Sequence, residues 1–417
     1  MSSLVRCVSS SGLRFQKVCS FLTHIRCSCS GVRRTRQRSA MASGLPAPRT
    51  AGGDGEGSYS RQSRLWSGMG SMLTPSLKDA ILNHFSPPAK GSGAIHYADF
   101  GCSVGANTLR FAQFVADTLK ARPDVIDRDV VCHFVDLPSN DFNTLFKQLP
   151  PFVGEGDGSG EERTWFADGV PGSQYRRMFP RSSLHVAITA LTLHYLSETP
   201  TSILDKSSPA YNKGKIGPNG SSPAAAEAYA EASRQGLREF FECRAEEIAS
   251  GGVLCFYTPG RRDRAHPEHQ LFEEIIHFLP PFEKAWKELV NEGVLTEESL
   301  DAFNIPICHP SIEELREAIE HPPSAFHIEK LDFIDKFALT PDNAEETVFK
   351  DAQAYGQFMV NMFNSGMGPM VGDYLGPELA AALVNRFRQI CEKDYPVKKA
   401  AGFPMYMSMC VAALIRK

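Results

Sequence analysis

The sequence predicts an α/β protein in which a parallel β-sheet is covered by helices on both faces and carries an inserted, mostly helical cap. Short apolar runs alternate with longer segments of helical periodicity, which is the pattern of βαβ units. The apolar runs are continuous, as expected for strands buried on both faces of a parallel sheet. A block of helical segments falls between two such strands, which places these helices outside the sheet.

The amino-terminal half supplies strands and helices in alternation. In order, we expect a strand, a helix, a strand, a helix and a strand at residues 95–100, 107–121, 130–135, 140–148 and 184–193. Glycines end the first strand, and Pro150 and Pro151 end the second helix. This half therefore provides at least three strands of the predicted sheet.

The carboxyl-terminal half contains the predicted cap. A loop at 205–223, rich in Ser, Pro, Gly and Asn, precedes a helix at 224–249, which Gly251 and Gly252 end. The elements that follow are a strand at 253–257, helical stretches at 268–320 and 344–364, a helix at 377–392 and a strand at 406–415. We expect the helical stretches within about residues 265–370 to form the cap.

The composition is that of an ordinary globular protein. The chain has 417 residues, of which 42% are hydrophobic and 22% charged, and this excludes disorder throughout. It has no run of about 18 uncharged apolar residues, which excludes a membrane-spanning helix. The net charge of −4 argues against a nucleic-acid-binding protein, which normally has a basic face.

Residues 1–50 form a leader that differs from the rest of the chain. Between Met1 and Gly53 there are nine Lys and Arg residues and no Asp or Glu, so the negative charge belongs to the remainder. An Arg-rich, Ser-rich and acid-free segment is typical of an organelle transit peptide, and we expect delivery to a plastid or mitochondrion. The alternatives are a basic tail that has no targeting function, translation from Met41 and a cytoplasmic location.

A glycine-rich turn gives the strongest local signal for a ligand site. Asp99 lies at the end of the first strand, and Gly101 and Gly105 lie between this strand and its helix, where glycines let a ligand approach the N–H groups of the helix N-terminus. The spacing is G-x-x-x-G, so the dinucleotide motif G-x-G-x-x-G is not met. Glycines that serve only packing are the alternative interpretation.

A second acidic residue, Asp136, ends the next strand. A carboxylate at this position is suited to the two hydroxyl groups of a ribose, although an aspartate that caps a helix or turn would look the same. Two carboxylates at neighbouring strand ends favour a cofactor with positive charge. S-adenosylmethionine carries a sulfonium and an ammonium group, whereas the pyrophosphate of NAD would be repelled.

These residues belong to segments that resemble a known family. The run A-D-F-G-C-S-V-G-A-N-T-L at 98–109 is similar to the I-A-D-L-G-C-S-S-G-P-N-T-L segment of the SABATH methyltransferases, the salicylate, benzoate, jasmonate and theobromine/caffeine methyltransferases of plants. Further blocks agree in order: G-G-D-G-E-G-S-Y at 52–59, D-L-P-S-N-D-F-N-T at 136–144, G-V-P-G-S at 169–173, H-Y-L-S at 194–197 and D-A-F-N-I-P at 301–306. The resemblance implies a Rossmann-like S-adenosylmethionine-dependent methyltransferase sheet, with residues 51–417 as the methyltransferase domain.

The resemblance also implies a site for S-adenosylmethionine. Carried over by position, its lining residues are Tyr59, Ser63, Asp99, Gly101, Cys102, Asn107, Asp136, Leu137, Ser173 and Gln174. Asp136 would accept the ribose hydroxyls, and Asp99 would help to hold the methionine end, directly or through water. Leu137 and Gln174 would bracket the adenine, with weaker stacking because Gln174 replaces an aromatic residue common in the family.

His194 and Tyr195 fall at the acceptor-site pair of the family, and with Trp66 they are the expected catalytic residues. The second residue of the pair is usually Trp, and the Tyr195 hydroxyl can replace its N–H as a donor to the acceptor carboxylate. Trp66 stands where the family has a Gln that grips the carboxylate, and Ala51 where salicylate-type members have a Lys. Trp66 and Tyr195 would then hold the acceptor carboxylate between them, with the indole N–H as donor on one side and the phenol hydroxyl on the other. Alternatively, Trp66 only lines the pocket, and the acceptor is larger or not a carboxylate.

Two further sets carry over by position. Cys308, Phe363, Gly366 and Met407 would shape the acceptor pocket, although a Met or Phe on a helix is more often a core residue. Asn212, Asp301, Phe303 and Asn304 match positions where some family members hold Mg²⁺, with Phe303 acting through its carbonyl. One carboxylate and two amides make a poor dedicated Mg²⁺ site, so Mg²⁺ is only a secondary expectation beside S-adenosylmethionine.

We therefore expect an S-adenosylmethionine-dependent carboxyl methyltransferase that converts a small, largely apolar acid into its methyl ester. A carboxylate is ionised at pH 7, so the in-line transfer needs no general base. N-methylation of a heterocycle within the same family and a non-catalytic ligand-binding homologue are the alternatives, and an NAD-dependent oxidoreductase would need the missing dinucleotide motif. The expected partners are the acid and a second copy in a homodimer, without nucleic acid or membrane.

Overall fold

The computed structural model describes residues 50–53, 55, 58–62, 69–89, 93–155, 160, 162–270, 279–321, 325–338, 349–401 and 406–417. Within the expected leader, only Thr50 is described, so the expectation for residues 1–50 lies outside this range. The same holds for Ser63 and Trp66, the second cofactor residue and the third catalytic residue predicted above.

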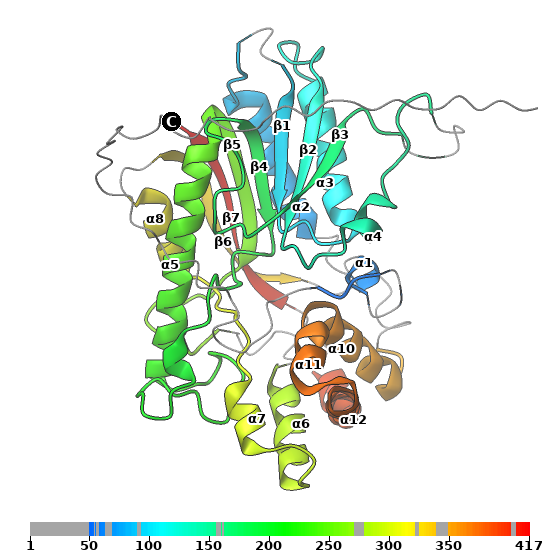
Figure 1. Cartoon of the computed structure of the whole chain (residues 1–417), viewed down its shortest axis with the longest axis vertical. Helices are drawn as coiled ribbons and strands as arrows, with labels where there is room; N and C mark the ends of the chain where they lie inside the picture. Colours follow the sequence, from blue (N-terminus) through cyan, green and yellow to red (C-terminus); the bar gives the residue numbers. More distant parts are fainter. Residues whose placement is uncertain are drawn as a thin grey trace, which may run out of the picture. The chain divides into compact units, whose positions relative to one another are not determined.

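A seven-stranded sheet in the order β3-β2-β1-β4-β5-β7-β6 forms the centre of the described part (Figure 1). The strands are β1 (Ile95–Phe100), β2 (Val130–Asp136), β3 (Phe166–Pro171), β4 (Leu184–Ala190), β5 (Ile248–Pro259), β6 (Phe326–Ala338) and β7 (Tyr406–Arg416). Neighbours from β3 to β5 are parallel, whereas β7 is antiparallel to both β5 and β6. The parallel sheet expected from the sequence is thus interrupted at β7, because the chain enters this strand from the end of the sheet where the cap lies (Figure 1).

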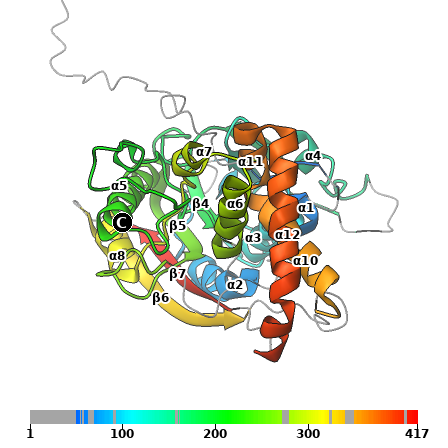
Figure 2. The same cartoon turned by 90° about the horizontal axis from the view of Figure 1, so that it is seen from below.

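Helices cover both faces of the sheet, as predicted. Side chains alternate along a strand, so Ile95 and Tyr97 of β1 pack in one buried cluster while Ala98 and Phe100 pack in another. The first face is covered by α2 (Gly70–Asp79) and α3 (Ala106–Lys120), the second by α5 (Pro223–Glu247) and α8 (Ile312–Glu320) (Figure 2). The long helix α5 is capped at its amino end by Ser222, whose side chain accepts a hydrogen bond from the N–H of Ala225.

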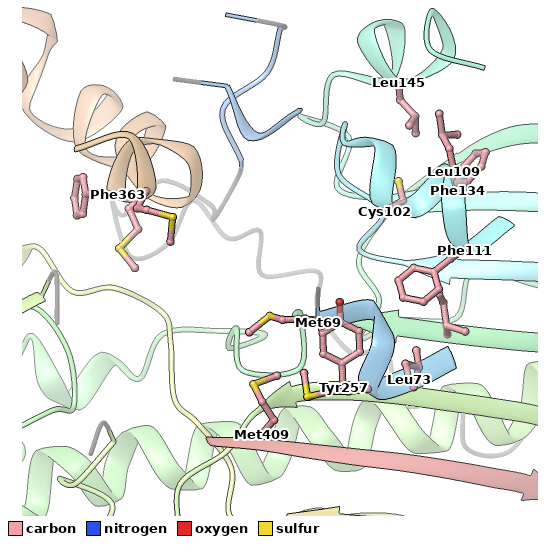
Figure 3. Packing of buried hydrophobic residues seen from close by; sticks show 14 of the residues in the cluster. Met69, Leu73, Cys102, Leu109, Phe111, Phe134, Leu145, Tyr257, Phe363 and Met409 are labelled. Carbon is pink, nitrogen blue, oxygen red and sulfur yellow. The ribbon is translucent and has the colours of Figure 1, made fainter. Parts of the chain in front are cut away.

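The cap is formed by helices beyond the carboxyl ends of the central strands (Figures 1 and 2). They are α6 (Leu279–Asn291), α7 (Glu297–Ala302), α10 (Ala352–Gly366), α11 (Gly368–Leu375) and α12 (Pro377–Ala400). Phe282 of α6 stacks on Phe363 of α10 with ring centroids 4.1 Å apart, and it meets Phe387 of α12 at 5.7 Å. Phe363 belongs to the same buried cluster as Phe134 and Tyr257 of the sheet, so cap and sheet share one core (Figure 3).

The two edge strands and the cap boundary differ from the sequence analysis. The expected cap range of 265–370 contains β6, which pairs with β7, and α8, which packs on the sheet face with α5; α12, beyond that range, packs against α10 and α6. Neither β3 nor β6 was predicted, because both lie at sheet edges and lack the continuous apolar run of a central strand.

Short elements complete the described part: α1 (Tyr59–Gln62), η3 (Ala80–His84), α4 (Phe142–Phe146) and η4 (Thr201–Ile203). In Figure 1, α1 lies between the sheet end of the molecule and α10, and α1 and α10 are in contact. Among the described residues, no helix is both long and apolar enough to cross a membrane.

Candidate active site

The sheet order creates a switch point at the carboxyl ends of its central strands. β1 pairs with β2 on one side and with β4 on the other, and ligands of open α/β sheets bind at such a point. Asp99 and Asp136 lie at the ends of β1 and β2, and His194 and Tyr195 follow the end of β4. The fold therefore brings the expected cofactor and acceptor residues to one edge of the sheet.

The turn after β1 requires glycine at position 101. Gly101 has a φ of +82°, and a Cβ on it would lie 2.2 Å from Cγ2 of Thr192. Its N–H donates to the carbonyl of Val135 in β2 at 2.8 Å. Ser103 follows with a φ of +53°, and its N–H donates to Oδ2 of Asp136 at 2.7 Å. The turn is thus hydrogen-bonded to β2 and packs against the segment that follows β4.

Asp99 is a buried carboxylate with one oxygen left without a partner. Its side chain is 2% exposed, and the Thr108 hydroxyl in the first turn of α3 donates to its Oδ2 at 2.5 Å. Oδ1 has no hydrogen-bond partner among the described residues. Burial raises the pKa of Asp99 to about 7; the Thr108 hydrogen bond opposes this shift and the charge of Asp136 adds to it. A buried oxygen of this kind fits a ligand that brings a donor or a positive charge.

Asp136 is held by backbone donors on both oxygens. Besides the Ser103 N–H on Oδ2, its Oδ1 accepts from the N–H of Leu137 at 2.7 Å. Burial raises the pKa of this carboxyl to about 6, and the two backbone hydrogen bonds limit the rise. The carboxylate is therefore fixed in orientation, and its remaining lone pairs are available to hydroxyl groups of a ligand.

The other expected cofactor residues lie in the same loops. Cys102 is buried, and its sulfur lies 4.0 Å from Nδ2 of Asn140, with the pKa of the thiol raised well above its usual value by burial. Asn107 is half-buried in the first turn of α3. Ser173 follows β3, and its hydroxyl accepts from the N–H of Tyr175 at 3.3 Å.

The segment 50–53 joins the cofactor loops to the cap, and sequence reasoning missed its contacts. The hydroxyls of Thr50 and Ser103 are 2.7 Å apart, and the N–H of Gly53 donates to Oδ2 of Asp141 at 3.0 Å. On the cap side, the N–H of Ala51 donates to the carbonyl of Ser365 at 2.9 Å. Asp141 stands inside the D-L-P-S-N-D-F-N-T block, which was the available signal for its role.

Tyr59 connects this segment with the acceptor side. Its N–H donates to the carbonyl of Ala51 at 2.9 Å. The pKa of its hydroxyl is raised, first by burial and then by Tyr195, Asp136 and Asp99. Tyr59 is therefore close to groups of both halves of the site.

His194 and Tyr195 form a neutral pair. Their rings lie 4.5 Å apart, and His309 meets His194 edge-on at 5.7 Å. Burial, with a contribution from His309, lowers the pKa of His194 well below its usual value. Its Nδ1 has no hydrogen-bond partner among the described residues. Burial and the charge of Asp136 raise the pKa of Tyr195 to about 12, so near pH 7 both side chains are uncharged and the Tyr195 hydroxyl keeps its proton.

Two of the four expected pocket residues, Gly366 and Cys308, lie next to the acceptor pair. A Cβ on Gly366 would lie 3.9 Å from the Tyr195 hydroxyl, and the N–H of Cys308 donates to the carbonyl of His194 at 2.8 Å. Phe363 is fully buried in the aromatic packing of the cap, as in the core alternative considered above. Met407 is a half-buried residue of β7 that pairs with Phe337 of β6.

The expected Mg²⁺ ligands also lie close together, but the side-chain oxygens of Asp301 and Asn304 already accept hydrogen bonds. This set is Asn212, Asp301, Phe303 and Asn304. Oδ1 of Asn304 accepts from Nδ2 of Asn212 at 2.7 Å and from the Tyr229 hydroxyl at 2.9 Å. The carboxylate of Asp301 accepts from the Tyr211 hydroxyl at 2.6 Å and from a backbone N–H at 2.7 Å. Because N–H and O–H donors occupy these oxygens, the residues do not fit a Mg²⁺ site.

This fold and this site define the class of protein as an S-adenosylmethionine-dependent methyltransferase. A family model described as SAM-dependent carboxyl methyltransferase matches residues 47–415. The chain therefore belongs to this family, which is the SABATH family that its sequence blocks resemble, and the prediction of the family is confirmed.

Known relatives cover most of the chain. Gibberellic acid methyltransferase 1 of Arabidopsis thaliana is 35% identical over 346 residues, which are 81% of this chain and 89% of that protein. The 3,7-dimethylxanthine N-methyltransferase CkTbS of Camellia sinensis var. assamica is 31% identical over 354 residues, which are 82% and 90% of the two chains. A solved structure of loganic acid methyltransferase with S-adenosylhomocysteine superposes with a TM-score of 0.73 at 28% identity, covering 88% of this chain and 98% of that one.

Proposed function

We propose that this enzyme transfers the methyl group of S-adenosylmethionine to the carboxylate of a small, largely apolar organic acid and releases the methyl ester. The observation that carries the proposal is the division of the site. Two carboxylates, Asp99 and Asp136, lie on the cofactor side, and an uncharged pair, His194 and Tyr195, lies on the acceptor side. Such an arrangement suits a cationic methyl donor next to an anionic acceptor.

The cofactor, when bound, supplies an electrophilic methyl group on a sulfonium. The chain's own contribution on this side is to bind and orient. Asp136, fixed by the N–H groups of Ser103 and Leu137, accepts the ribose hydroxyls. Asp99, with its unpartnered Oδ1, holds the positively charged methionine end. Leu137 and Gln174 flank the adenine.

On the acceptor side, the residues hold the carboxylate in line and exclude water. The Tyr195 hydroxyl donates to one carboxylate oxygen, and the neutral His194 lines the same site without adding charge. No residue needs to remove a proton, because the acceptor is already ionised. Neutral donors hold the anion less tightly than a buried Lys would, so the ground state is not overstabilised.

Transfer of label from S-adenosylmethionine to a panel of substrates tests this proposal. The panel contains gibberellic, indole-3-acetic and loganic acids, suggested by the names of relatives, with 3,7-dimethylxanthine as the nitrogen acceptor. We expect labelled methyl esters that alkaline hydrolysis converts back to acid and methanol. An alkali-stable N-methyl product would favour the second candidate, which the 31% identical N-methyltransferase supports. Binding of S-adenosylhomocysteine without any transfer would favour a non-catalytic homologue.

We also propose that the basic leader directs the chain to a plastid or mitochondrion. The support is compositional: nine Lys and Arg residues and no acidic residue before Asp54. A fusion of residues 1–53 to a fluorescent protein is expected to enter an organelle, and diffuse cytoplasmic fluorescence would contradict the proposal. The homodimer and the exclusion of nucleic acid stay predictions, which light scattering and a nucleic-acid shift assay would test.

A further inference from the structure

The side chain of Gln174, in the segment after β3, forms hydrogen bonds with the segment after β4. Its Oε1 accepts from the Thr192 hydroxyl at 2.9 Å, and its Nε2 donates to the Thr192 carbonyl at 3.3 Å. The same carbonyl accepts from the N–H of Tyr195 at 3.0 Å. The next residue, Tyr175, donates its hydroxyl to the carbonyl of Tyr195. Two consecutive residues after β3 therefore hold the backbone around the acceptor pair.

The turn at residues 191–195, which these hydrogen bonds hold, has an unfavourable backbone conformation. Leu191 adopts a φ of +58°, which is unfavourable for a residue with a branched side chain. His194 is buried with an unpartnered Nδ1, as described above. Conformations of this kind persist only where the surrounding contacts determine them. The hydrogen bonds from Gln174 and Tyr175 are such contacts.

Thr192 also touches the cofactor side of the site. Its methyl group occupies the space where a Cβ of Gly101 would lie. Its hydroxyl contacts the Thr189 hydroxyl as well as Gln174. Thr192 is therefore in direct contact with the turn after β1, and its carbonyl accepts a hydrogen bond from the N–H of Tyr195.

A buried ion pair on α5 fixes the backbone of the segment after β3. The guanidinium of Arg244 on α5 donates to the carbonyl of Gln174 at 2.7 Å and pairs with Glu247 at 2.8 Å, both side chains being fully buried. Glu247 in turn accepts from the N–H of Phe179 at 3.1 Å. The Arg244 guanidinium lies 3.9 Å from the ring centroid of Phe100 in β1. The backbone of Gln174 is thus anchored to α5 and β1.

We propose that Gln174 is a positioning residue that couples cofactor binding to the orientation of His194 and Tyr195. The proposal rests on the proposed function, because it needs a cofactor in contact with the turn after β1. An aromatic residue at position 174 could stack on adenine but could not make the two hydrogen bonds to Thr192. With glutamine at this position, the chain lacks aromatic stacking on the adenine but gains two hydrogen bonds to Thr192, next to the acceptor pair.

Amide hydrogen exchange of the full chain, with S-adenosylhomocysteine as the probe, tests this coupling without knowledge of the acceptor. In the wild type we expect saturating ligand to slow exchange in peptides covering 99–109 and 191–197, the latter by about fivefold or more. In Gln174→Phe the slowing at 99–109 is kept and that at 191–197 is lost. Thr192→Val, which keeps the shape and removes the hydroxyl but leaves the backbone carbonyl that accepts from Gln174, should weaken the slowing at 191–197 by a smaller amount. Gln235→Phe, on an exposed face of α5, is the control that keeps both effects.

Turnover gives a second measurement that a purely structural role would not produce. Gln174→Phe is expected to lower kcat about tenfold while the KM for S-adenosylmethionine does not rise. Ligand-induced slowing at 191–197 that survives in full in Gln174→Phe, or that is missing in the wild type with bound ligand, would overturn the coupling. If S-adenosylhomocysteine does not bind the wild type at all, the proposed function itself has failed, and the two failures are distinguishable.

Discussion

The two halves of the site are built from opposite kinds of group. The cofactor half has two carboxyls, the buried Asp99 and the half-buried Asp136, with pKa values raised to about 7 and about 6. The acceptor half is neutral near pH 7, because burial lowers the pKa of His194 and raises those of Tyr195 and Cys308 to about 12. The difference teaches how one small site accommodates a cation and an anion: charge attracts the cofactor, whereas neutral donors orient the acceptor.

The largest effect should come from removing a charge on the cofactor half. We expect Asp136→Ala to weaken S-adenosylhomocysteine binding by about 10- to 100-fold, since hydrogen bonds to a charged group contribute about 1.5–3 kcal/mol. Titration calorimetry measures this. Asp127→Ala, in an exposed turn, is the matched control and should bind as the wild type does. Unchanged affinity in Asp136→Ala would remove this residue from the ribose role.

A change on the neutral half should affect turnover instead. Tyr195→Phe removes one neutral donor and is expected to lower kcat on a carboxylic acid by about five- to tenfold, the value of one ordinary hydrogen bond. Its affinity for S-adenosylhomocysteine should equal that of the wild type. If the variant turns over at the wild-type rate, the hydroxyl is not the donor to the acceptor.

The size of the acceptor side can be tested at Gly366. A Cβ at this position would lie 3.9 Å from the Tyr195 hydroxyl, so the methyl groups of Gly366→Val would narrow the pocket. We expect the KM of the preferred acid to rise by about threefold to tenfold, with a smaller change for a shorter acid. Gly372→Val in α11, where a Cβ meets nothing within 4 Å, is the control. Equal effects on long and short acids would contradict a role in the pocket.

The smallest expected effect is that of divalent cations. The side-chain oxygens of Asp301 and Asn304 accept hydrogen bonds from protein donors, so a metal ion is not needed to satisfy them. We expect exhaustive treatment with EDTA to leave the melting temperature and the methyl-transfer rate unchanged within error. A rate that falls with EDTA and returns with Mg²⁺ would show that these residues do bind the ion.

The sequence predicted the centre of the fold better than its edges. The continuous apolar runs at 95–100, 130–135 and 184–193 became β1, β2 and β4, because central strands must be apolar on both faces. β3 contains Asp168 and Gly169 in an exposed pattern, and β6 has charged residues next to apolar ones, so neither has that signature. The direction of β7 depends on where the cap returns the chain, which no local pattern encodes.

In the site, too, some residues could be predicted from the sequence and others could not. Asp99, Gly101 and Asp136 could be predicted as site residues because their chemistry and their positions at strand ends are visible in the sequence. Thr108 and Thr192 were missed because their roles arise from contacts across the fold: a hydroxyl on Asp99 and a methyl group against Gly101. A threonine carries no sequence signal for such a contact, and only the packed structure reveals it.

The central claim, that ionised carboxylates draw a cationic ligand to the cofactor half, is tested most directly by the pH dependence of S-adenosylhomocysteine binding. The ammonium group of the ligand favours the ionised forms of Asp99 and Asp136, so binding releases protons wherever these carboxyls are partly protonated in the free enzyme. Affinity should therefore be greatest near pH 8 and fall as the pH is lowered through 7 and 6. Asp99→Asn should remove the part of this fall that lies near pH 7. Affinity that stays level or rises between pH 8 and pH 5.5 would contradict the account.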